Sequence, residues 1–161
     1  MAIKSEPLAT RLERYLLRQI PISQALGVSV IKADLDEILI TAPLDGNINH
    51  HGTAFGGSVS AIAILSGWSL VYTRLETEDQ FPAIVIQHNE IRYLKAIEGP
   101  FAARARLAYP EKWTHFCQTL SRHGKARTIV AVEVEAAHGV SARFQGTFVA
   151  LRQKTIYRAH E

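Results

Sequence analysis

The sequence is poor in cysteine, and this shortage bounds the chemistry that the chain can perform. Cys117 is the one cysteine among 161 residues, so no disulfide can form within the chain and a reducing compartment is expected. Trp113, Phe116 and Leu120 share with Cys117 the spacing of one apolar helix face. That spacing favours a thiol in the core over a reactive nucleophile.

Long hydrophobic runs are also missing. The most apolar stretch, residues 59–72, is shorter than the ~20 residues that span a bilayer, and it contains several serines. A helix of this length that is apolar all round is typical of a buried central helix. Residues 1–17 carry charges of both signs and lack the apolar region of a signal peptide. We therefore expect a cytoplasmic protein with no membrane partner.

The excess of positive over negative charge is small. The net charge is +3 with histidine neutral, which is short of what a dedicated nucleic-acid-binding protein shows. The basic residues of the second half could hold the phosphates of a nucleotide-like carrier, or could simply form a solvated face. They are Arg104, Arg106, Arg122, His123, Lys125 and Arg127. With 47% hydrophobic residues, the length fits a single domain, residues 1–161.

Apolar spacing predicts the order of helices and strands. An N-terminal helix is expected from Pro7 to a point before Pro21. Strands are predicted at 28–32, 38–42, 83–94, 101–109, 126–136 and 140–151, a long helix at 55–75, a short one at 111–121, and a hairpin turn at His138–Gly139. A sheet of about six antiparallel strands can bury an all-apolar helix only by curling round it. The pattern therefore predicts an α+β fold.

The chemistry is expected where a polar loop meets the long helix. Gly56 and Gly57 open the most apolar helix of the chain although glycine disfavours helix formation. Without side chains, the first-turn N–H groups stay accessible at the positive end of the helix dipole. They suit a carbonyl oxygen that becomes an oxyanion under attack. Alternatively, the two glycines only allow the helix to pack closely on the sheet.

The loop before the glycines supplies polar groups. Asn49, His50, His51 and Thr53 lie next to the helix start, and histidine can act as a base near neutral pH. The two histidines could equally be solvated loop residues. No Cys, Asp or Glu cluster completes a metal site with them, so we expect no metal.

These residues carry a resemblance to a known superfamily. The run Asn49-x-x-Gly52-x-x-Phe55-Gly56-Gly57 resembles the hotdog thioesterases, whose phenylacetyl-CoA thioesterase branch has Asn-x-x-Gly-x-x-His-Gly-Gly there. Further segments are similar to the putative thioesterases of the YiiD C-terminal type. These segments are 42–44, 47–49, 66–68, 91–97 and 144–150, and the resemblance covers roughly residues 27–151.

The resemblance implies a hotdog fold, a curled sheet wrapped round the central helix, and a function in hydrolysing acyl-CoA or acyl-carrier thioesters. It implies a homodimer, or a tetramer, with sheets joined edge to edge and acyl-thioester pockets between subunits. No cofactor is implied except coenzyme A as part of the substrate. Gly56 and Gly57 would form the oxyanion hole, and Asn49 would orient water or substrate.

Further residues are expected to contact the substrate, with the acyl chain along Phe55, Val59 and Ile62. The expected set is Asn47, Gly52, Thr53, Phe55, Ser58 and Val59, with His88 and Asn89 contributed across the subunit interface.

The sequence departs from the phenylacetyl-CoA thioesterase branch at two positions. Phe55 stands where that branch has histidine, and Ile64 stands where it has an acid. A general base would then come from His50 or His51, from Asp45, or across the interface from His88 or Asn89. A non-catalytic protein that binds acyl thioesters is the alternative. A hotdog dehydratase is disfavoured, because the helix start offers no histidine–carboxylate pair.

Overall fold

The computed structural model describes residues 6–153, which form one antiparallel sheet and four α-helices. In chain order the elements are α1 (Leu8–Gln19), α2 (Ile22–Leu26), β1 (Ser29–Ala33), β2 (Ile38–Ala42), α3 (Gly56–Thr77), β3 (Ala83–Tyr93), β4 (Phe101–Leu107), the 3₁₀ turn η1 (Pro110–Lys112), α4 (Trp113–His123), β5 (Lys125–Ala136) and β6 (Gly139–Leu151). The strands are ordered β1-β2-β4-β5-β6-β3, and every neighbouring pair is antiparallel.

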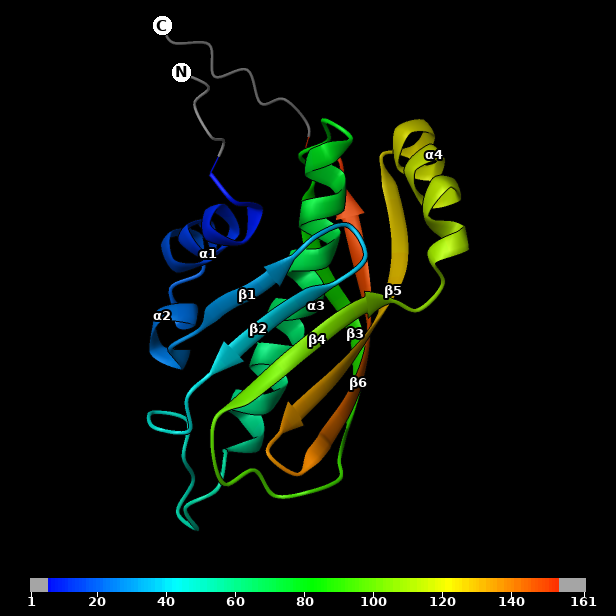
Figure 1. Cartoon of the computed structure of the whole chain (residues 1–161). Helices are drawn as coiled ribbons and strands as arrows, with labels where there is room; N and C mark the ends of the chain where they lie inside the picture. The colour runs from blue at the N-terminus through cyan, green and yellow to red at the C-terminus, as the bar shows by residue number, and fades with distance from the viewer. Residues whose placement is uncertain (1–5, 154–161) are drawn as a thin grey trace, which may run out of the picture.

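The sheet curls round α3, as the sequence predicted (Figure 1). Half of the helix residues are fully buried, on nearly every side of its axis. Gly67 allows the closest approach, because a Cβ there would lie 2.9 Å from the ring of Phe148 on β6. Ser66 is a buried polar residue of α3, and its hydroxyl donates to the carbonyl of Ala103 on β4 (3.1 Å). No helix within residues 6–153 is long and apolar enough to cross a membrane.

Helix α1 packs on the outside of α3 through aromatic rings. The ring of Tyr15 stacks on Tyr72 (centroids 4.6 Å apart) and on Trp68 (6.1 Å). The sequence did not predict α2, which begins directly after Pro21. It ends at Gly27, whose φ of +67° favours glycine. Together the two helices cover one flank of α3.

Helix α4 closes the opposite end of the core with Phe116 and Leu120. Cys117 is half-buried and packs against the same core. Burial, together with the charge of Glu78, raises the pKa of the Cys117 thiol. A raised pKa keeps the thiol protonated, which agrees with the predicted structural role.

Glu37 is the central residue of an ion-pair cluster on the outer face of the sheet. It lies in the turn between β1 and β2, and its side chain is 5% exposed. Its carboxylate accepts hydrogen bonds from Arg104 (2.5 Å) and Arg106 on β4 and from Lys32 (3.4 Å) on β1. Burial alone would raise the pKa of Glu37, but the hydrogen bond from Arg106 and the three positive charges outweigh it and lower the pKa.

We predict that Glu37→Gln lowers the free energy of unfolding at pH 7 by about 1–3 kcal/mol, because the charged hydrogen bonds are lost. A lowered pKa in the folded state stabilises the protein above the ordinary glutamate value of 4.5, and this stabilisation is lost as pH falls through the folded-state pKa. Urea unfolding across pH 3–7 should therefore show a smaller acid-dependent loss in the variant. Identical pH profiles of the two proteins would contradict the prediction.

Candidate active site

The first turn of α3 presents backbone N–H groups that have no acceptor in the described part of the chain. Phe55 precedes the helix in an extended conformation (φ −65°, ψ 129°), and no side chain caps the helix. Within residues 6–153, the N–H groups of Gly56, Gly57 and Ser58 have no acceptor. Gly57 is exposed to solvent. These donors and the helix dipole create a site for a negatively polarised oxygen.

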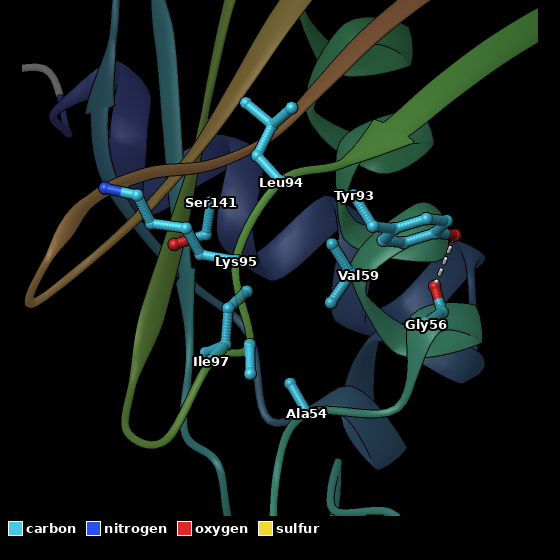
Figure 2. A pocket seen from close by; sticks show the side chains of 9 residues that line it. Ala54, Gly56, Val59, Tyr93, Leu94, Lys95, Ile97 and Ser141 are labelled. Carbon is cyan, nitrogen blue, oxygen red and sulfur yellow. Dashed lines mark hydrogen bonds between the residues drawn. The ribbon is translucent and has the colours of Figure 1, made fainter.

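A cavity of about 340 Å³ opens beside this turn. It is lined by Ala54, Gly56 and Val59 at the start of α3, by Tyr93, Leu94, Lys95, Ala96 and Ile97 at and after the end of β3, and by Ser141 on β6. Figure 2 shows the Tyr93 ring lying across the helix start. Its hydroxyl donates to the carbonyl oxygen of Gly56 (3.0 Å).

The segment after β3 is fixed to its neighbours by main-chain hydrogen bonds. The N–H groups of Leu94 and Lys95 donate to the carbonyl of Ser141 (2.8 and 3.1 Å). The N–H of Ala54 donates to the carbonyl of Ile97 (2.8 Å). The start of α3 and the segment after β3, which are far apart in sequence, thus form the two walls of the cavity. The hydrogen bond from Ala54 connects them.

The cavity lining is nearly free of charge. Lys95 is its one charged residue, and in Figure 2 its side chain points away from α3. Its Nζ donates to the carbonyl of His138 in the β5–β6 hairpin (2.9 Å). Among residues 6–153, no carboxylate or imidazole lines the cavity.

The predicted Asn49 is placed in the loop before α3, where it makes local hydrogen bonds. Its Oδ1 accepts from the N–H groups of His51 (2.8 Å) and Thr53 (3.2 Å), and its Nδ2 donates to Thr53 Oγ1 (2.9 Å). Gly52 adopts a φ of +81°, which lets the loop turn back. Asn49, Gly52 and Thr53 therefore hold one another in a tight turn.

Asn47 was predicted to contact substrate, and the structure gives it a different contact. It is 2% exposed, and its Nδ2 donates to the carbonyls of Leu26 and Pro43 (both 2.8 Å). Its own carbonyl accepts from the N–H of Phe55 (2.7 Å). Because its side chain is enclosed, Asn47 fixes the loop to α2 and to the helix start instead of facing the cavity.

The predicted histidines lie outside the cavity of a single chain. His50 and His51 are exposed at the loop tip, with ring centroids 3.8 Å apart. His88 and Asn89 are exposed on β3, opposite Thr147 and Gly146 of β6. Of the predicted site residues, Gly56 and Val59 line the cavity. Gly57 and Ser58 lie beside them in the first turn of α3, and none of the candidate bases lines the cavity.

The expected acyl path along the helix is also corrected. Ile62 is completely buried against the sheet, so no ligand can lie along it. Phe55 is 57% exposed, and its ring occupies the space next to Gly57.

Sequence reasoning missed the second wall of the cavity. Residues 93–97 belong to a segment of the resemblance, but no local signal assigns them to the helix start. The pairing of β3 with β6, in which Tyr93 lies opposite Ala142, brings this segment to the start of α3. The sequence offers only a weak signal that Tyr93 belongs to the site, namely a tyrosine near the end of a predicted strand.

A curled six-stranded antiparallel sheet around one long helix is the hotdog fold, and several solved structures share it. A protein of unknown function from Chlorobaculum tepidum TLS is 26% identical, with 91% of this chain and 95% of that chain covered and a TM-score of 0.85. A putative thioesterase from Shewanella oneidensis is 26% identical, with coverage of 89% and 97% and a TM-score of 0.77. A thioesterase from Haemophilus influenzae, 15% identical with coverage of 98% and 100% and a TM-score of 0.73, shares the fold.

The family is defined by a sequence match over most of the chain. Residues 9–152 match the family described as "Putative thioesterase (yiiD_Cterm)". The chain belongs to this family, which confirms the resemblance carried by the loop and glycine motif.

Proposed function

We propose that this protein hydrolyses acyl thioesters of coenzyme A or of an acyl carrier protein at the start of α3. The observation that carries the proposal is the set of three unpartnered N–H groups of Gly56, Gly57 and Ser58 beside a cavity of about 340 Å³. The thioester oxygen would accept a hydrogen bond from Gly57. Water would attack the carbonyl carbon, the oxyanion would be stabilised by the helix start, and the C–S bond would then break to release acid and thiol.

Tyr93 supports the oxyanion site indirectly in this proposal. Its hydroxyl donates to the carbonyl of Gly56, which belongs to the same peptide group as the N–H of Gly57. A hydrogen bond to the carbonyl of a peptide polarises its N–H and strengthens it as a donor. Tyr93 would therefore be a positioning residue for Gly57.

The general base is assigned to the loop histidines, with His50 favoured because it directly follows Asn49. Both histidines belong to the turn that Asn49 and Thr53 form, a few residues before α3. Asp45, or His88 and Asn89 from a second copy, are the other sources of a polar group that could position water.

A homodimer joined through β3 would bring the second copy to the site. Two such dimers would form the tetramer. The outer side of β3, an 11-residue strand, has no strand partner within the described part of the chain. Val85, Tyr93 and Leu94 beside this edge are each about half exposed (47%, 54% and 47%). Long apolar strand edges are normally covered.

A second candidate function is binding of acyl thioesters without hydrolysis. The lining of the cavity, which lacks carboxylates and imidazoles, favours it, as does Ile64 in the position of the acid. The two functions can be separated by incubating the protein with a panel of acyl-CoAs and measuring the free thiol that hydrolysis releases. A thioesterase releases thiol from at least one of them, and a binding protein releases none.

We predict that Gly57→Val lowers kcat/KM for acyl-CoA by about 10²-fold or more, because a side chain obstructs the main oxyanion donor. A Cβ at this position would meet the exposed ring of Phe55 (2.3 Å to Cε1), which can swing into solvent. The fold should therefore survive, as checked by circular dichroism.

Two controls make this test specific. Gly99→Val places the same side chain where a Cβ has no neighbour within 4 Å, and Phe55→Ala removes the ring while keeping the Gly57 donor. If Gly57→Val folds and hydrolyses acyl-CoA as fast as Gly99→Val, the oxyanion site is misassigned.

We predict that replacing the loop base with alanine lowers kcat by about 10²-fold, the range of a general base. The His50→Ala, His51→Ala and double variants should be compared over pH 5–8. The loss of a general base should lower the rate across this range. A double variant with the wild-type rate and pH profile would exclude both residues as the base.

We predict a mass in solution of at least twice the 17.9 kDa of one chain, measured by light scattering at micromolar concentration. Amide exchange should also be slow along the outer edge of β3, where a partner strand would accept hydrogen bonds. A monomeric mass with fast exchange along β3 would rule out the edge-to-edge dimer.

A further inference from the structure

A second cavity lies on the flank of α3 and is almost entirely apolar. It has a volume of about 240 Å³. Ile20, Ile22 and Leu26 of the α1–α2 segment form one wall, and Ile84 and Ile86 of β3 form the other. We call this cavity the flank groove. Ile22 at its mouth is 56% exposed.

The floor of the flank groove lies on the same face of α3 as Gly57 of the proposed oxyanion site. Ala61, Ile64 and Trp68 of α3 line the groove. With Gly57 they are spaced four, three and four residues apart, so all four share one helix face. This is the face of α3 that the sheet leaves only partly covered. The groove therefore begins one helical turn after Gly57.

The chemistry of the lining defines the ligand. No charged side chain of the described residues lines the flank groove. The indole N–H of Trp68 is already used, because it donates to the carbonyl of Ile84 (3.0 Å). A ligand in the groove can therefore make apolar contacts with the side chains and finds no hydrogen-bonding side chain, which suits a hydrocarbon and disfavours a peptide or a sugar.

We propose that the flank groove binds the alkyl chain of the acyl group and selects a medium-length aliphatic chain. The link to hydrolysis rests on the proposed function. From Ala61 to Trp68 the helix rises about 10 Å, and Trp68 is fixed at the far end by its stacking on Tyr15 and Tyr72. An apolar cavity of about 150 Å³ holds benzene, so the larger groove fits a chain of roughly eight to ten carbons.

The test compares straight-chain acyl-CoAs from acetyl to hexadecanoyl. Each added methylene that enters the groove should raise kcat/KM about fourfold, from the transfer free energy of one CH₂. The rise should stop at about eight to ten carbons. A flat profile, or a preference for acetyl-CoA, would overturn the groove assignment while leaving the hydrolysis proposal intact.

The variant Ala61→Phe should fill the groove from the helix side. The ratio of kcat/KM for decanoyl-CoA to that for acetyl-CoA should fall at least ~100-fold, the contribution of three to four methylenes. Ala102→Phe is the matched control, because Ala102 faces outward on β4, opposite Thr41 and Glu135. If Ala61→Phe leaves the ratio unchanged and instead converts a dimer into a monomer, the groove is a contact between copies and the proposal is wrong.

A binding measurement tests the groove without hydrolysis. In a Trp113→Phe variant, Trp68 is the one remaining tryptophan. Sodium decanoate should change its fluorescence saturably, and the further change Ala61→Phe should abolish this effect. Decanoate binding without turnover of any acyl-CoA would support the groove and reject hydrolysis. Absence of a saturable signal from Trp68 would overturn the groove proposal whether or not thioesters are cleaved.

Discussion

The long helix α3 is apolar on nearly every side, and a helix of this kind is stable in water only when other elements cover it all round. One flat sheet can cover only one side, so the sheet has to curl round the helix. Tyr15 of α1 adds cover by stacking on Tyr72 of α3. Small residues on the helix make close contact possible. At Gly67 the ring of Phe148 lies where a side chain would otherwise be. The curl of the sheet follows from this burial requirement.

The cover is incomplete at the first turn of α3, and the candidate active site lies there. Gly57 is exposed although it belongs to the most buried helix of the protein. The walls next to it come from main-chain contacts: Ala54 donates to Ile97, and Leu94 donates to Ser141. Hydrogen-bonded backbone is less mobile than free loops, so the donors at the helix start are held in place before a ligand arrives.

The fold could be predicted from the sequence because its signals are local. The period-two alternation of residues 140–150 and the mostly apolar composition of α3 identify their elements without any knowledge of their neighbours. The glycine pair likewise marked the helix start. Long-range contacts could not be predicted in this way. Tyr93 reaches Gly56 only through the pairing of β3 with β6. Asn47 looked like a ligand-binding residue because its loop is polar, but burial against α2 turned its amide inward.

The isoleucine at position 64 and the apolar flank groove are best understood as one feature. Ile64 lies in the middle of the groove floor, between Ala61 and Trp68. A carboxylate there would lose hydration on entering an apolar site with no hydrogen-bonding side chain to replace water, which costs several kcal/mol per ion. An alkyl chain packed against that carboxylate would increase the cost, because it excludes the remaining water. An acid on this face of α3 and a groove for a hydrocarbon chain are therefore incompatible. If the groove holds the acyl chain, the group that activates water has to come from another part of the protein or from a second copy.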